Sequence, residues 1–392
     1  MLSFRRAFLL ALLLHALAYL PSLPNGFVFD DHAIVEGQPE VRGEAPLAGV
    51  FSTTWFHQGK EGGAIAYRPV SLASLGLDVR LLGLDPAPLR AGNLFWGAVG
   101  AALLGLLAVE LGAWRAAAAA VVVLFSLHPV RSDVVLSIVG RAELLSFAAV
   151  AGALLLAVRS AAASPGSRRA LAAASGLALA LGLLSKETAF AAPLLLGAML
   201  VVPALREAWR ARLSRLAPVG LSWGLAVGCV LALRVAVLGG PLTGPAVTVS
   251  PVENKLAVRP ASERLAGALS MVPLAAARLV LPRTLVADYG SNAIPDSALQ
   301  GAARVSAGAA ILVVVAGTAL LSRRRSGLLS IGLWWVLLSW LPFANFAFPT
   351  ATLFTERLLF LPAAGVALAL GGAVAAAPAS ARRAALLAVL AL

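Results

Sequence analysis

The chain contains 392 residues, of which 60% are hydrophobic and only 12% carry a charged side chain. Soluble domains carry about 25% charged residues, so this composition excludes a soluble globular protein and an intrinsically disordered one. The single cysteine excludes a disulfide-stapled scaffold and a cysteine-rich metal site. The net charge of +13 fits either nucleic acid or a membrane as partner, and the positions of the charges separate the two.

Long segments without charged residues predict an all-α polytopic membrane protein. The hydrocarbon core of a bilayer is about 30 Å thick and needs about 20 apolar residues in a helix. Flanking arginines that reach the interface can extend a segment that is slightly short. We expect eleven spans, at residues 7–22, 86–111, 116–130, 142–158, 170–184, 188–204, 216–238, 303–322, 326–343, 357–377 and from 384 onward. The last segment has only nine residues, so we expect the chain to be cut inside its final span.

The arginines predict which side of the membrane each loop occupies. With the N-terminus inside, the inner segments carry 15 arginines and two acids, whereas the rest of the chain carries 16 basic and 16 acidic residues. The net charge therefore lies on the cytoplasmic face, which is typical of a membrane protein and argues against nucleic acid as the partner. This count requires residues 262–283, interrupted by Pro273 and Arg278, to form a re-entrant or interfacial helical pair on the outer side.

The first outer loop, residues 23–69, carries an acidic pair at Asp30 and Asp31. Two adjacent carboxylates beside Phe27 and Phe29 raise the pKa of one of them or recruit a cation. They therefore suit a general base or, if a metal is bound, a divalent-cation site. The structural alternative is an Asx turn or a helix N-cap at the start of the loop.

Arg68 lies at the end of the same loop, directly before Pro69. Its functional interpretation is a contact to phosphate, and its structural alternative is a side chain that reaches the interface from the membrane. Leucines recur through residues 70–83 with charged residues on another face. This pattern predicts a helix that begins at Pro69 and lies along the interface before the second span.

The densest group of polar residues lies between two predicted spans. His128, Arg131 and Asp133 are followed by Arg141 and Glu143 at the start of the next span. Charges at membrane depth are costly and usually mark function, so we expect the arginines to bind an anion and the acids to position them. The alternative is an interfacial cluster whose charges neutralise one another.

Other polar residues fall on the predicted outer side as well. Lys186 and Glu187 occupy a hairpin so tight that two spans meet there, which suits a cation for an anionic head group or, alternatively, a local ion pair. Asp288 and Glu356 lie on the same side. His15, by contrast, lies inside the first span and is expected to pack between helices.

The sequence lacks the motifs of several other functional classes. It contains no P-loop, GxGxxG, HExxH or GxSxG pattern, which are the signatures of nucleotide binding and of common hydrolases. Neither a 34-residue repeat nor an inverted repeat with paired broken helices is present. The absence of an inverted repeat argues against a secondary transporter.

The polar motifs occur in one fixed order along the chain. They are Asp30-Asp31, Tyr67-Arg68-Pro69, His128-Pro129-Val130, Gly140 to Ser146, Lys186-Glu187, Asp288-Tyr289, Leu341-Pro342, Asn345-Phe346 and Glu356-Arg357. Their order and spacing resemble the transmembrane and tetratricopeptide-repeat O-mannosyltransferases, including the bacterial relatives of that family, over residues 5–377. The chain departs from the family at Arg131 and Asp133, which stand where the family has His and Glu. Arg90 and Gly97 stand where it has two further His.

The resemblance implies an integral membrane glycosyltransferase of the GT-C fold, a bundle of about eleven helices here whose long first outer loop carries the active site. It implies a reaction centre on the outer face, which in a bacterium is the periplasmic face of the inner membrane. Such enzymes take a sugar from a polyprenyl-phosphate carrier, and the family carries tetratricopeptide repeats after its last span. The acceptor is a hydroxyl of a protein Ser or Thr or of a glycan, and mannose is one candidate sugar. The alternatives are a non-catalytic scaffold and a lipid-carrier transporter, and the near absence of acids on the inner face argues against transport.

Each predicted residue has a role in this reaction. The leaving phosphate needs cations, and the candidates are Arg141, Arg131 and Lys186, with Arg68 behind them. The acceptor hydroxyl needs a base, for which we expect Asp31 before Asp30, with the other acid tuning it or holding a divalent cation. The supporting residues are His128, Asp133, Glu143, Glu187, Asp288 and Glu356.

Overall fold

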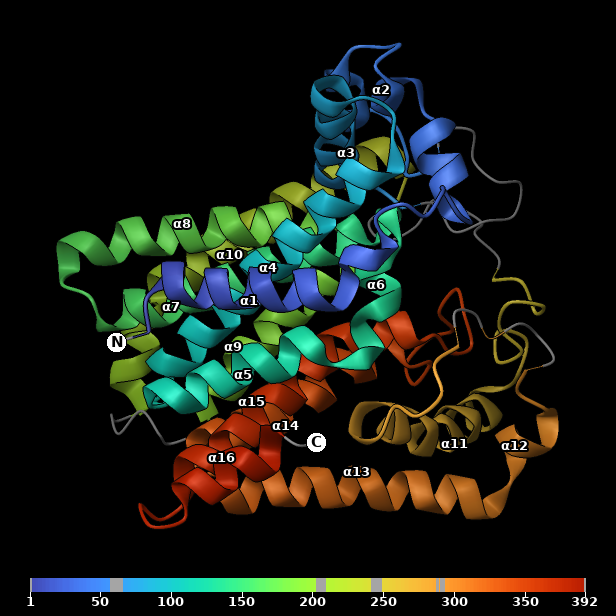
Figure 1. The fold of residues 1–392 in the computed structure, drawn as a ribbon. Coiled ribbons are helices and arrows are strands. Elements are labelled where there is room, and N and C mark those ends of the chain that lie inside the picture. Colours follow the sequence, from blue (N-terminus) through green and yellow to red (C-terminus); the bar gives the residue numbers. More distant parts are fainter. Residues whose placement is uncertain are drawn as a thin grey trace.

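The computed structural model describes residues 2–56, 66–201, 209–240, 249–286, 289 and 293–390. Over these ranges every regular element is a helix and no strand is formed (Figure 1). A helical chain is expected where water is absent, because a helix satisfies its backbone N–H and C=O groups within itself. The predicted all-α class is therefore confirmed for the described residues.

A helix lies at each predicted span, but within the described residues not all of these helices have the length and composition needed to cross a membrane. The helices are α1 Phe4–Tyr19, α4 Pro86–Glu110, α5 Arg115–Leu127, α7 Arg141–Ala162, α8 Pro165–Leu183, α9 Ala192–Val201, α10 Trp209–Leu238, α13 Ala302–Ser322, α14 Gly327–Trp340, α15 Phe360–Ala376 and α16 Arg382–Leu390. Within the described ranges, six helical segments are long and apolar enough to cross. A seventh results if α5 and Pro129–Leu136, which meet at a bend of 53°, form one broken span. The structure thus supports a polytopic membrane protein and does not confirm eleven spans.

The remaining helices fall short for physical reasons. The 14 residues of α14 reach about 21 Å at 1.5 Å per residue, which is less than a bilayer core. α9 and α16 are shorter still, with 10 and 9 residues. α8 is long enough, but its first turns contain Arg168 and Arg169, which lower its mean hydropathy.

Small residues let the helices approach one another closely. α14 packs along α15, α7 contacts both α4 and α8, and α1 lies against α4 and α5 (Figure 1). Where α14 meets α15, a Cβ atom added to Gly332 would lie 2.3 Å from the backbone N of Ala369. A larger residue would push these helices apart. Close approach matters here because van der Waals packing is a main attraction between helices in a membrane.

The segment after α1 folds into short turns that pack on α3 at one end of the molecule (Figure 1). Its helical pieces are a π-helical turn at His32–Glu36, α2 at Pro39–Arg42, a 3₁₀ turn at Leu47–Phe51 and α3 at Pro69–Leu82. Ile34, Val41, Leu72 and Leu75 form a second, smaller core that also takes in Val139. The helix predicted to begin at Pro69 is confirmed.

The segment between α10 and α13 differs from its prediction. Residues Ala261–Val280 form one continuous helix, α11, with Pro273 inside it, where we expected a pair of helices. A proline within a helix removes one backbone hydrogen bond, and the packing of α11 along α13 supports the helix despite this loss. The short helix α12 follows at Asp296–Gln300. The interfacial position of residues 262–283 stays a prediction.

Candidate active site

A cavity of about 380 Å³ lies where several distant segments of the chain meet. These segments are residues 25–30, α4, residues 129–139, residues 285–286 and the first turn of the last candidate span. The charged residues of its wall are Asp30, Arg90, Asp133, Glu356 and Arg357, and Phe29 and Leu285 are among the apolar ones. The structure therefore brings three predicted carboxylates, Asp30, Asp133 and Glu356, into one cavity.

Asp30 lines the cavity and is half-buried. Its carboxylate has no hydrogen bond to any residue that the structure describes, and the positive charge of Arg357 acts on it. The preceding residue, Phe29, has a φ of 48° and is 81% exposed. A bulky side chain is strained in this left-handed region, so contacts elsewhere must hold the turn that presents Asp30.

Asp31 is adjacent to Asp30 but has a different environment. It is fully buried, does not line the cavity, and accepts two backbone hydrogen bonds, from Val28 N to Oδ2 at 3.2 Å and from Val139 N to Oδ1 at 3.0 Å. Burial raises the pKa of Asp31, although both hydrogen bonds and the charge of Arg90 oppose the rise. The two carboxylates are thus unequal, and Asp31 joins the turn before α2 to the turn before α7.

Arg90 of α4 also holds the segment before Asp31, through its carbonyl groups. Its guanidinium donates to the backbone oxygens of Asn25 and Gly26, and its Nε donates to Leu136 O at 3.1 Å. Arg90 was named in the sequence only as a departure from the family pattern. Its four hydrogen bonds, including one to Leu23 O at 3.5 Å, are to carbonyls of distant segments, which no local sequence signal reveals.

Arg357 and Glu356 lie next to each other on the cavity wall. Arg357 donates to both carboxylate oxygens of Asp133, from Nε to Oδ2 at 3.0 Å and from Nη2 to Oδ1 at 3.2 Å. Glu356 is buried and its Oε1 accepts from the Tyr289 hydroxyl at 2.8 Å and pairs with Arg278 Nε at 2.9 Å. The sequence indicated the pair Glu356-Arg357, but it assigned no role to Arg357.

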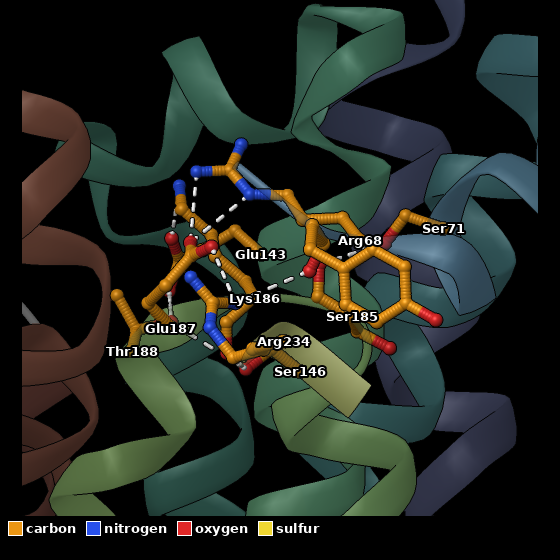
Figure 2. Close-up of polar contacts among 10 residues, drawn as sticks. Arg68, Ser71, Glu143, Ser146, Ser185, Lys186, Glu187, Thr188 and Arg234 are labelled. Atoms are coloured by element: carbon orange, nitrogen blue, oxygen red, sulfur yellow. Dashed lines mark hydrogen bonds and ion pairs between the residues drawn. The ribbon is translucent and has the colours of Figure 1, made fainter. Parts of the chain in front are cut away.

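A second group of charges surrounds the hairpin between α8 and α9, and Figure 2 shows its contacts. Lys186 Nζ pairs with Glu143 Oε2 at 2.6 Å, and the Thr188 hydroxyl donates to Glu143 Oε1 at 2.8 Å. Burial lowers the pKa of Lys186, against the opposing charge of Glu143, and the positive charges of Arg68 and Arg357 lower it further. Because the positive charge of Arg357 lowers the pKa of Lys186, the charges on the cavity wall and those at the hairpin lie near each other.

Glu187 lies between two guanidinium groups in this cluster (Figure 2). Arg68 donates to its Oε2 through Nε at 3.0 Å and Nη2 at 2.9 Å, and Arg234 Nη1 lies 3.2 Å from Oε1. Burial alone would raise the pKa of Glu187, but the two arginines outweigh it and lower the pKa to about 2. Arg234 was not predicted, although a lone arginine inside an apolar span is itself a signal of function.

Arg141, a predicted phosphate ligand, does not line the cavity and has four acceptors within the protein. It is fully buried and donates to Asn93 Oδ1 at 2.7 Å, Asp78 Oδ2 at 2.8 Å, Ser74 Oγ at 2.8 Å and Leu89 O at 2.8 Å. These acceptors belong to α3 and α4, so Arg141 joins three helices. Glu143, its expected neighbour, pairs with Lys186 instead.

Arg131 and His128 are likewise engaged within the protein. Arg131 is fully buried, donates to Phe125 O at 2.7 Å, and lies 3.2 Å from His15 Nε2 with its guanidinium over the Phe125 ring. His15 packs between helices as expected, and its Nδ1 contacts Ala11 O at 2.7 Å. His128 Nε2 contacts Leu279 O at 2.9 Å, which ties the end of α5 to the end of α11.

Some predicted features cannot be placed in this way. Asp288 lies outside the described residues. Within the described part of the chain, no group of three or more His, Cys, Asp or Glu side chains could hold a metal ion. The acidic pair gives no support to a shared cation, because its two members face different surroundings.

Comparisons with known proteins agree with the resemblance of the motifs. The chain is 29% identical over 288 residues to the protein O-mannosyl-transferase Tmtc2 of Drosophila melanogaster, covering 71% of this chain and 30% of that protein. It is 31% identical over 134 residues to the human protein O-mannosyl-transferase TMTC1 and 29% identical over 159 residues to F38B6.6 of Caenorhabditis elegans, which has the same enzyme name. These two matches cover 33% and 39% of this chain, and 15% and 23% of the relatives. The chain thus matches less than a third of each relative. No family model and no solved structure matches it.

Proposed function

We propose that this chain is a membrane glycosyltransferase of the GT-C type that moves a sugar from a polyprenyl-phosphate carrier to a hydroxyl acceptor. The names of the relatives, protein O-mannosyl-transferases, support mannose as the sugar and a protein oxygen as the acceptor, for which a Ser or Thr hydroxyl is our proposal. One observation carries the proposal. The Asp30 carboxylate, which has no hydrogen-bond partner among the described residues, lines a cavity together with the Arg357 guanidinium.

The reaction needs a base for the acceptor, and we assign this role to Asp30. Its carboxylate takes the proton of the acceptor hydroxyl while the hydroxyl oxygen forms a bond to the anomeric carbon of the sugar. The bond between that carbon and the phosphate oxygen breaks, and its electron pair leaves with the polyprenyl phosphate. Asp31 is less suited to this role, because both of its oxygens already accept backbone hydrogen bonds.

The leaving phosphate needs cations, and Arg357 and Lys186 are best placed to provide them. Arg357 lines the cavity, and its positive charge acts on Lys186, which is one of the predicted cations. Lys186 has three N–H donors, so it can keep Glu143 as a partner and still donate to an oxygen of the ligand. Arg141 and Arg131 are better explained as structural arginines, because their hydrogen bonds hold helices together.

The arginine distribution supports an orientation in which the cavity opens on the extracytoplasmic side of a bacterial inner membrane. The segment that carries Asp30 directly follows the first candidate span, which ends at Ser22. We therefore expect a carrier embedded in the outer leaflet to present its phosphate near this segment.

The test is sugar transfer from a radiolabelled polyprenyl-phosphate mannose donor, measured in membranes that contain the full chain and a Ser/Thr-rich peptide. Asp30→Asn keeps the size of the side chain and removes its basicity, so we expect transfer to fall about 10²- to 10⁴-fold. Glu44→Gln is the matched control, since Glu44 is an exposed carboxylate of the same region that pairs with Arg42. Near-normal transfer by Asp30→Asn would remove Asp30 as the base. Wild-type protein that releases no polyprenyl phosphate from any donor would instead indicate a scaffold.

A further inference from the structure

The turn at residues 23–31 must be held in place if Asp30 is to act on an acceptor. Phe29 is mostly exposed and adopts a strained left-handed conformation, so its own packing does not fix the turn. The Asp30 carboxylate makes no hydrogen bond within the described structure that would fix its position. The restraint must therefore come from neighbours of Asp30 in sequence and in space.

Two side chains supply this restraint through different backbone groups of the turn. Arg90 donates from α4 to the carbonyls of Asn25 and Gly26, before the strained residue. Asp31 accepts from the amide of Val28 within the turn and from the amide of Val139, which lies 108 residues further along the chain. The Arg90 cation thus holds two carbonyls, and the Asp31 anion holds two amides. The strained Phe29 and the following Asp30 lie in sequence between the carbonyls held by Arg90 and Asp31 itself.

We propose that Arg90 and Asp31 form a two-point clamp that positions Asp30 in the cavity, and that neither is a catalytic residue. This inference rests on the proposed function, in which Asp30 is the base. A guanidinium can bind two carbonyls of one turn at once because its donors form a rigid fork, and a lysine cannot reproduce this. A carboxylate can accept from two amides at once, whereas the amide group of asparagine offers only one oxygen.

The clamp predicts how two conservative substitutions act. Arg90→Lys keeps the charge but loses the fork, and Asp31→Asn keeps the shape but loses one of two acceptors. Displacing a reacting group by about 1 Å can cost about 10²-fold in rate, so we expect either variant to lower kcat about 10- to 100-fold. The donor KM should stay within about threefold because the phosphate ligands are unchanged. Arg42→Lys, at an exposed arginine of the same region, should leave both constants unchanged.

The experiment combines kinetics with hydrogen exchange of the purified full chain. In both clamp variants, amides of residues 23–31 should exchange faster than in wild type, and in Asp31→Asn the Val28 or Val139 amide should do so as well. The core of α7 should stay protected and report an intact fold. The dependence of kcat on pH should keep its shape in both variants, because the base is still present.

The outcomes separate the clamp from the proposed function. Unchanged exchange over residues 23–31 in both variants would overturn the clamp. Loss of the acidic limb of the pH–rate profile in Asp31→Asn, with unchanged exchange, would also overturn it and make Asp31 the base. Faster exchange together with a fully active Asp30→Asn variant would support the clamp as a physical restraint while the assignment of Asp30 as base fails.

Discussion

Two arginine–carboxylate pairs in this molecule have similar distances and opposite surroundings. Arg141 pairs with Asp78 at 2.8 Å and Arg357 pairs with Asp133 at 3.0 Å. The Arg141 side chain is 0% exposed and has three further acceptors, whereas the Arg357 side chain is 31% exposed and lines a cavity. An arginine can bind a ligand only with donors that the protein has not already used. The two arginines therefore differ in how many N–H donors remain for a ligand and in whether a ligand can reach them. A charge near a membrane does not by itself distinguish them.

The largest effect that we expect from this contrast is on the free energy of unfolding. We expect Arg141→Ala to lower the free energy of unfolding by about 3–5 kcal/mol, because it removes a fully buried guanidinium and leaves its four acceptors on α3 and α4 without their donor. Arg141→Lys should recover only part of this, since one ammonium cannot reach the acceptors of both α3 and α4. Thermal unfolding of the detergent-solubilised protein measures both variants.

Arg357→Ala is the matched comparison for Arg141→Ala. Its pair is partly exposed, so its removal should cost about 1 kcal/mol or less while sugar transfer falls. The contrast would be contradicted if Arg141→Ala unfolded at the wild-type temperature and instead lost donor binding.

The next effect concerns the acid sensitivity of the Glu187 cluster. The pKa of Glu187 is lowered from 4.5 to about 2, so its contribution to stability is complete above pH 4.5 and is lost as the pH falls through 2. This difference corresponds to about 3 kcal/mol, at 1.36 kcal/mol per pH unit. Glu187→Gln should therefore be less stable than wild type at pH 7. The difference in free energy of unfolding between the two proteins should become smaller as the pH falls from 4.5 to 2.

Thermal unfolding of both proteins across this pH range tests the cluster. Glu44→Gln, at an exposed carboxylate, should follow the wild-type curve throughout. If Glu187→Gln were as stable as wild type at pH 7, the pairs with Arg68 and Arg234 would contribute nothing to folding.

Local patterns in the sequence predicted much of the fold. Charge-free segments located the helices, Pro69 located the start of α3, and the short interval at residues 185–187 located the hairpin at Lys186. Each of these signals acts within one or two turns of a helix. The predicted number of spans is not confirmed, because composition does not set helix length, as α14 shows with 14 residues.

The sequence indicated many residues of the candidate site, but it did not indicate which of them contact one another. Asp30 and Asp31 differ by one position, and only the conformation of the turn decides which of them reaches the cavity. Arg141 was paired with Glu143 in sequence, whereas in space it meets Asp78, 63 residues away. Such contacts depend on how α3, α4 and α7 pack, which no local pattern encodes.

The departures from the family pattern become intelligible in the structure. At position 97, a Cβ atom would lie 2.7 Å from His15 Nε2, so His15 fills the space in which a side chain would stand. At position 90, an arginine reaches carbonyls on two segments. Both positions at which the chain lacks a family His therefore have defined surroundings in this structure.

The measurement that tests the cavity most directly is protection of a cysteine placed in its wall. Ser132 lines the cavity and Ser52 is exposed outside it, so each is replaced by Cys in a Cys229→Ser background. We expect a thiol reagent to abolish transfer by the Ser132→Cys protein, and polyprenyl-phosphate mannose at ten times its Kd to slow that labelling about tenfold. Labelling of Ser52→Cys should be unaffected by the donor. If the donor protected neither position and the modified Ser132→Cys protein still transferred sugar at the unmodified rate, the cavity would not be the site of transfer.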